Sequence, residues 1–123
     1  MCEIDDDGEV WDFCRMTIRQ ARKLHRCGEC RRPIDPGEKY RYLTGKFDGE
    51  IQTIRQCAHC AIAADLLVRE CGGYPIGGVQ DEMFAHVNWD VPWRMRAARN
   101  AIAMSRRWMR FDGAGLMVVP VLR

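Results

Sequence analysis

The amino-acid sequence predicts a small α+β fold in which strands come first and helices follow. The first observation is a pair of segments rich in β-branched and aromatic residues, 38–44 and 50–56, on either side of an Asp-Gly turn. The second is the alanine- and leucine-rich segment 57–70, which predicts a helix that ends at two glycines. The third is the C-terminal half, where 79–89 and 91–111 predict one short and one long amphipathic helix.

The chain of 123 residues is long enough for one domain with its own core. Residues 1–14 hold six acidic residues and no lysine or arginine, and we expect an acidic, partly disordered N-terminus there. We expect a compact unit over residues 15–73 and an arginine-rich helical part over 74–123 that packs on it. The boundary is predicted at 72–78, where glycine and proline are dense.

Four of the seven cysteines form two Cys-x-x-Cys pairs, Cys27 with Cys30 and Cys57 with Cys60. One such pair could be a redox dithiol, but a redox dithiol needs no second pair and normally begins a helix. The first pair here begins a turn rich in proline and glycine instead. Zn²⁺ prefers four soft ligands in a tetrahedron, and two short chelate loops supply them. The sequence therefore predicts one structural zinc ion per chain, bound by these four thiolates.

The 26 residues between the two pairs have a geometric explanation. A hairpin of two seven-residue strands is about 23 Å long, and its two ends meet. The chain that leaves Cys30 therefore returns to its starting point at Cys57. The second pair then lies in the first turn of a helix, where unpaired N–H groups and the helix dipole favour thiolates.

Residues 25–71 resemble a treble-clef zinc finger, with a knuckle that carries the first pair, a β-hairpin, and a helix whose start carries the second. Residues 17–60 also resemble small zinc-finger proteins of bacteriophages and prophages, through the Pro-Gly-Glu-Lys-Tyr step (36–40) and the Phe-Asp-Gly turn (47–49). The resemblance implies a treble-clef-like fold, but little about function. The implied zinc ligands are Cys27, Cys30, Cys57 and Cys60.

The remaining histidines and cysteines beside the pairs are not expected to bind the metal. His25 and His59 adjoin the cysteines, but four thiolates already complete a tetrahedron. Cys71 lies eleven residues after Cys60, about 16 Å along a helix, which is too far to reach the site. Cys2 and Cys14, like Cys71, are expected to be ordinary thiols.

We expect no catalysis from this chain. A site closed by four cysteines has no open position for water or substrate, so the metal stabilises the fold. The alternative is an HNH-like nuclease, because treble clefs also occur in such enzymes. These enzymes need histidines in the hairpin, and residues 39–56 contain none.

The long C-terminal segment contains an arginine stripe, which we define as Arg96, Arg99, Arg106, Arg107 and Arg110. On a helix over 91–111 these side chains share an arc about 100° wide, and apolar residues fill most of the remainder. The stripe is either the solvent-exposed face of a helix that packs on the core or a surface that binds a polyanionic partner. Five like charges without an acid among them favour the partner.

A second basic group surrounds the first cysteine pair and could add to a phosphate-binding surface. It comprises Arg15, Arg19, Arg22, Lys23, Arg26, Arg31 and Arg32. The net charge of +2 and the pI of 8.2 are mild, so these clusters and not the total charge predict a nucleic-acid partner. An acidic host protein is the alternative partner, in which case the chain would be an inhibitor or regulator of host machinery, such as an anti-defence protein.

The sequence also carries expectations about location. It has no apolar run of 18 residues and no signal-peptide pattern at residues 1–13, so we expect no membrane insertion. Seven cysteines without an export signal favour a reducing compartment. We therefore expect the protein in the cytoplasm, which would be that of a bacterial host if a phage encodes it.

Overall fold

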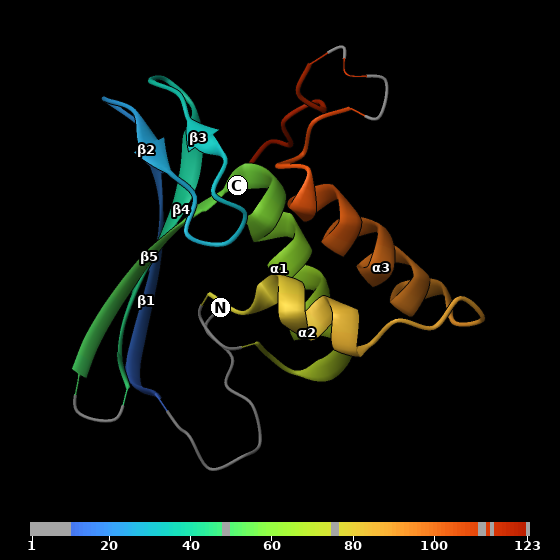
Figure 1. The fold of residues 1–123 in the computed structure, drawn as a ribbon. Helices are drawn as coiled ribbons and strands as arrows, with labels where there is room; N and C mark the ends of the chain where they lie inside the picture. The colour runs from blue at the N-terminus through green and yellow to red at the C-terminus, as the bar shows by residue number, and fades with distance from the viewer. Residues whose placement is uncertain (1–10, 48–49, 75–76, 111–112, 114, 123) are drawn as a thin grey trace.

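The computed structural model of the protein describes residues 11–47, 50–74, 77–110, 113 and 115–122. The architecture is α+β, with strands in the N-terminal half and helices after them (Figure 1). In chain order the elements are β1 (Trp11–Gln20), β2 (His25–Arg26), β3 (Pro33–Ile34), β4 (Lys39–Phe47), β5 (Glu50–Cys57), α1 (Ala58–Cys71), α2 (Val79–Ala85) and α3 (Pro92–Ser105).

Three strands form an antiparallel sheet in the order β1-β4-β5. The predicted hairpin is present as β4 and β5, with Phe47 opposite Glu50 at its tip and Tyr40 opposite Cys57 at its base. Its turn residues, 48–49, lie outside the described residues. The short strands β2 and β3 pair with each other and form the knuckle, residues 25–34.

Strand β1 differs from the expectation for the N-terminus. Residues 11–14, expected to belong to a partly disordered segment, are the first residues of β1. The strand pairs with β4 from Trp11 opposite Phe47 to Gln20 opposite Lys39, and this long ladder offsets the entropy lost on ordering the segment. Residues 1–10 lie outside the described residues.

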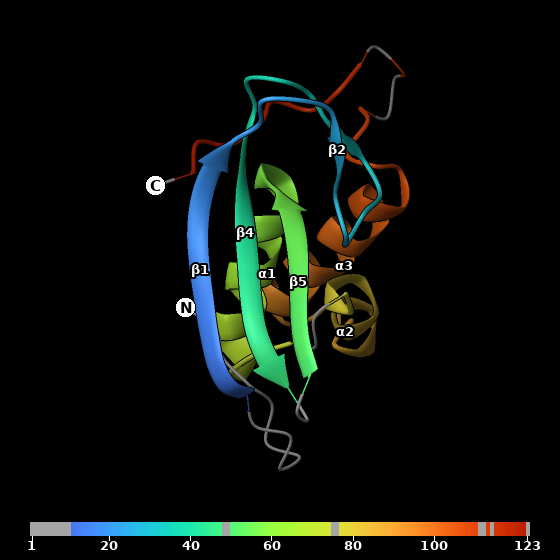
Figure 2. The same ribbon diagram turned by 90° about the vertical axis from the view of Figure 1, so that its left-hand side faces the viewer.

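Helices cover only one face of the sheet. α1 packs on β4 and β5, and α3 packs on α1 and α2, so that α1 lies between the sheet and α3 (Figure 1). Small buried residues of one cluster, Ala63 and Ala64 on α1 and Ala97 and Ala101 on α3, allow these helices to pack closely. Figure 2 shows the opposite face of β1, β4 and β5 in front of the helices and uncovered by them.

The first helix has the predicted extent, but the two C-terminal helices are shorter than expected. α1 ends at Cys71, and Gly72 follows it in the left-handed conformation, at φ 91°. α2 ends at Ala85 instead of residue 89. α3 ends at Ser105 instead of residue 111, so the prediction of one helix over 91–111 is wrong.

A Schellman motif explains where α3 ends. Arg107 adopts a left-handed φ of 53° and its N–H donates to the carbonyl of Met104 (2.9 Å). The N–H of Trp108 donates to the carbonyl of Ala103 (2.8 Å). These two bonds are the 5→2 and 6→1 pair of the motif, whose left-handed position glycine normally occupies. Here an arginine occupies this position, so the sequence lacks the glycine that would have predicted the end of the helix.

One cluster of buried side chains joins the two halves of the chain. It contains the four paired cysteines together with Leu67 of α1, Met83 of α2 and Met104 of α3. The division of the chain into parts at residues 73 and 74 stays a prediction. No helix in the described part of the chain is both long and apolar enough to cross a membrane.

Arg107→Gly should increase the free energy of unfolding by about 1 kcal/mol, because glycine adopts a left-handed φ without the steric cost that a β-carbon adds. Denaturant-induced unfolding measures the difference. Arg99→Gly is the matched control, because Arg99 is exposed in the middle of α3. There, replacement by glycine should lower the free energy of unfolding by about 1 kcal/mol. A loss of stability in both variants would contradict the Schellman motif at Arg107.

Candidate functional site

The four cysteines of the two pairs meet at one point. Cys27 and Cys30 come from the knuckle, while Cys57 ends β5 and Cys60 lies in the first turn of α1. All four are buried, and their sulfur atoms lie within 4.8 Å of one another. Four buried cysteines are therefore positioned to hold one metal ion.

The spacing of the sulfurs fits a zinc ion. Four ligands at a Zn–S distance of about 2.3 Å define a tetrahedron whose edges are about 3.8 Å long. The Cys30 and Cys57 sulfurs are 3.8 Å apart. Four soft thiolates in a closed shell are the donor set of structural zinc sites, so the cluster suggests zinc binding.

The knuckle supplies N–H donors to the sulfurs. Backbone N–H groups of Glu29, Cys30 and Cys57 point at the Cys27 sulfur at 3.4, 3.5 and 3.3 Å. The Arg32 N–H donates to the Cys30 sulfur at 3.4 Å. Hydrogen bonds from the other three thiols, that of Cys30 first, hold the pKa of Cys27 well below its ordinary value. Such donors stabilise the thiolate form that a metal requires.

The glycine within the first pair has a packing role. The Gly28 N–H donates to the Arg55 carbonyl (2.7 Å), which fastens the knuckle to β5. A β-carbon on Gly28 would overlap the side chain of Ile54. The glycine after Cys27 is therefore explained by the close approach of the knuckle backbone to that of β5.

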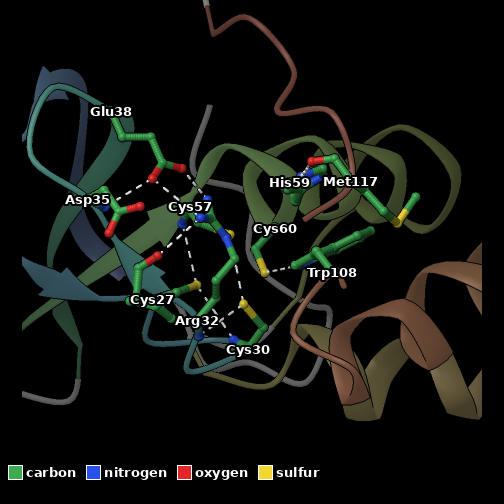
Figure 3. A network of polar contacts seen from close by, with 11 residues as sticks. Cys27, Cys30, Arg32, Asp35, Glu38, Cys57, His59, Cys60, Trp108 and Met117 are labelled. Atoms are coloured by element: carbon green, nitrogen blue, oxygen red, sulfur yellow. Dashed lines mark hydrogen bonds and ion pairs between the residues drawn. The ribbon is translucent and has the colours of Figure 1, made fainter. Parts of the chain in front are cut away.

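Trp108 contacts the cluster from the C-terminal part of the chain. Its indole N–H donates to the Cys60 sulfur at 3.2 Å, and its ring stacks on His59 at 4.7 Å between centroids (Figure 3). The Nε2 of His59 lies 3.2 Å from the Met117 carbonyl, which can only accept, so this nitrogen carries the proton. Burial is the main reason that the pKa of His59 is lowered, which favours the neutral ring.

Neither of the two neighbouring histidines belongs to the group of metal-ligating side chains. His59 is turned toward Trp108 and Met117, as described above. His25 is half-buried beside the ring of Tyr40, at 5.5 Å between centroids. Cys71 lies at the far end of α1, where its thiol faces the Gly73 carbonyl at 3.6 Å.

Arg32 does not belong to the exposed basic group in which the sequence placed it. Only 3% of the residue is exposed, and its guanidinium pairs with the Glu38 carboxylate (Figure 3). Burial opposes its charge, but Glu38 and the Cys57 sulfur outweigh burial and raise the pKa of Arg32. A buried cation beside four thiolates offsets part of the negative charge that a zinc–tetrathiolate carries.

Glu29 connects the knuckle to the C-terminal helices. Its buried carboxylate accepts hydrogen bonds from the N–H groups of Gly77 (3.1 Å) and Val79 (3.2 Å) and from the Gln56 amide (3.3 Å). Burial is the main reason that the pKa of Glu29 is raised. The Gln56 amide oxygen in turn accepts a hydrogen bond from Arg41 (3.2 Å), so the hydrogen-bond network continues between the sheet and α1.

The open face of the sheet is basic. We define the basic sheet face as Arg15, Arg19 and Arg55 on the strands with Arg22 and Lys23 after β1. These side chains line a broad hollow of about 1190 Å³ and a smaller one of about 330 Å³, which share Arg19. No carboxylate of the described residues lines either hollow. The sequence grouped most of these residues but missed Arg55, which only strand pairing brings to them.

Tyr42 lies at the centre of the basic sheet face. On β4 it is opposite Thr17 of β1 and Arg55 of β5. The Arg19 guanidinium lies over the Tyr42 ring, 3.9 Å from its centroid, and that of Arg55 lies 5.5 Å away. Both distances are within the range of cation–π interactions.

All five residues of the arginine stripe are exposed. Only Arg96 and Arg99 lie on α3, because the helix ends at Ser105, so the five do not form one helical arc. Apolar residues were expected to fill the rest of the helix beside the stripe, and four of them are buried: Ala97, Ala101, Met104 and Trp108. The role of the stripe in partner binding stays a prediction.

The chain has no match among protein families, curated proteins or solved structures. The geometry of the cysteine cluster therefore carries the assignment of the metal centre. The resemblance to treble-clef fingers and to phage proteins stays an expectation.

Cys57→Ser should abolish stoichiometric zinc binding and the cooperative unfolding transition, because the ligands meet only in the folded chain and metal affinity is then folding free energy. Elemental analysis and thermal unfolding measure the two effects. Cys71→Ser removes an exposed thiol outside the cluster and should keep one zinc ion per chain. Metal-free wild-type protein would contradict the assignment.

Trp108→Phe should keep the stack on His59 but lose the N–H donor to Cys60. Outer hydrogen bonds of this kind contribute about tenfold or more to metal affinity, so zinc should pass to a competing chelator about tenfold more readily. Trp93→Phe is the control, since Trp93 packs against the same core without a hydrogen bond to sulfur among the described contacts. Equal zinc affinity in both variants would mean that the indole N–H does not support the site.

Proposed function

We propose that the protein is a non-catalytic, zinc-stabilised module that binds nucleic acid through the basic sheet face. The observation that carries this proposal is the gathering of five cationic side chains around two adjoining hollows that no described carboxylate lines. We also propose that the knuckle, hairpin and α1 form a treble-clef-like unit, in keeping with the order of these elements.

The metal centre supports a structural role and not a catalytic one. The four sulfurs are buried, and together they would complete the coordination of one zinc ion. With zinc bound, the site has no open position for substrate. The metal would instead hold the knuckle against β5 and so fix one wall of the basic sheet face, since Gly28 of the knuckle bonds to Arg55.

The charge on the open face favours a polyanion. Like charges held together repel one another, and this repulsion is relieved when phosphates neutralise them and release their counterions. The face is also broad and open, which suits an extended ligand better than a small molecule. The modest net charge of +2 does not oppose this, because five cations gather around these two hollows without a described carboxylate that lines them.

A protein partner is the second candidate, and a separate surface favours it. Phe84, Val87 and Trp89 follow one another around the end of α2 and are exposed, Trp89 by 58%. Apolar and aromatic side chains beside arginines are enriched at protein–protein interfaces. This surface would suit a protein partner and a regulatory role, and the exposed Arg96 and Arg99 of α3 would favour an acidic partner.

Arg19→Glu with Arg55→Glu should greatly weaken binding to DNA and reduce the slope of log affinity against log salt by about two units, one for each lost phosphate contact. Fluorescence-anisotropy titrations over a range of salt concentrations measure both quantities. Arg19 is exposed and Arg55 is half-buried, so the free energy of unfolding should fall by about 2 kcal/mol or less and the protein should stay folded.

Arg96→Glu with Arg99→Glu is the matched control, with the same change of charge on a helix that α1 separates from the sheet. This variant should retain most of the affinity. Equal or greater loss of affinity and slope in the control would assign DNA binding to the arginine stripe instead of the basic sheet face.

A further inference from the structure

We infer that the basic sheet face binds single-stranded nucleic acid, with one base stacked on the guanidinium of Arg19. This inference rests on the proposed function, because it specifies the ligand of the same face. It follows from the arrangement of planar groups on the three strands, from the width of the sheet, and from the position of the hollows.

Arg19 and Tyr42 already form a close cation–π pair. The guanidinium of Arg19 lies over the Tyr42 ring at 3.9 Å, which holds a flexible side chain in one orientation. Arg19 is exposed, whereas Tyr42 is partly buried beneath it. The outer surface of the guanidinium is therefore a flat, pre-oriented platform, and a nucleic-acid base can extend the stack as a third layer.

A paired base is less accessible to this face than an unpaired one. The major groove of B-DNA is about 12 Å wide and admits one helix or a two-stranded ribbon. The axes of three strands at about 4.8 Å spacing span about 10 Å, and the bulk of the outer backbones brings the sheet to about the full width of the groove. The bases of a duplex are also paired and stacked on one another, so a base could lie on Arg19 only after it had been unpaired and unstacked. An unpaired strand has no such restriction, since its bases are free to turn toward the protein.

The cationic side chains beside Arg19 are positioned to contact the phosphates of a single strand. Arg19 separates the two hollows, with Arg15 on one side and Arg22 and Lys23 on the other. A strand whose base stacks on Arg19 would thus have cations for the phosphates before and after that base. Arg55, 5.5 Å from the Tyr42 ring, adds a cation on the third strand.

Three DNA probes of equal length test the inference: an oligothymidylate of about twelve nucleotides, a duplex containing it, and an abasic strand of the same sugar-phosphate backbone. Wild-type protein should bind the oligothymidylate about tenfold more tightly than the abasic strand, because a stacked base adds affinity that phosphates cannot. Arg19→Lys keeps the charge but loses the plane. It should lower affinity for oligothymidylate about tenfold and leave the abasic strand unchanged.

Three further variants separate stacking from folding. Arg99→Lys, a conservative change on α3 outside the basic sheet face, should leave the affinity for all three probes unchanged. Tyr42→Phe preserves the ring under Arg19 and should behave like wild type, while Tyr42→Ala should behave like Arg19→Lys. Zinc content and the unfolding midpoint of each variant show whether the fold is retained.

The outcomes distinguish this inference from the proposed function. Equal affinity of wild-type protein for the three probes would overturn the inference and leave a phosphate-binding module. Tighter binding of the duplex would do the same. Failure to bind any probe at low salt would overturn the proposed function, and the inference with it.

Discussion

The meeting of four sulfur atoms at one point constrains the rest of the structure. Two sulfurs come from the knuckle and two from the junction of β5 and α1, so the hairpin between them must return to its start. Cys57 belongs to β5, and Cys60 to the first turn of α1. Their convergence therefore sets the angle at which α1 leaves the sheet, and α3 packs on the helix so placed.

Hydrogen bonds extend this constraint into the C-terminal half. Trp108, which follows α3, donates to Cys60, and Glu29 of the knuckle accepts from Val79 at the start of α2. Both contacts are buried, where an unpaired donor or acceptor would be costly. The helices are thereby tied to the cysteine cluster, while the opposite face of the sheet stays clear of them (Figure 2).

Local patterns made part of this structure predictable. The spacing of the cysteine pairs, the Asp-Gly turn and Gly72 each act within a few residues, and the cluster, the hairpin and α1 are all present. Pairing of β1 with β4 is non-local, and no local pattern announces it. The end of α3 was also hidden, because Arg107 occupies a position that normally carries glycine.

Residue type alone could not separate the arginines by role. Arg32 and Arg15 belong to the same basic group in the sequence, yet Arg32 is buried against Glu38 and Arg15 is exposed on the sheet. Arg55 lies far from that group along the chain but joins it through the pairing of β5 with β4. The basic sheet face is a product of strand register, which only the folded chain defines.

The position of β1 has a consequence for self-association. Among the described strands β1 pairs only with β4, so it is an edge strand of the sheet. Such an edge is a template for pairing with the same strand of another copy. Two copies joined in this way would bring their exposed arginines, Arg15 and Arg19, onto one continuous sheet, where like charges across neighbouring strands are unfavourable. The arginines of the open face would thus also oppose pairing of two copies through this edge.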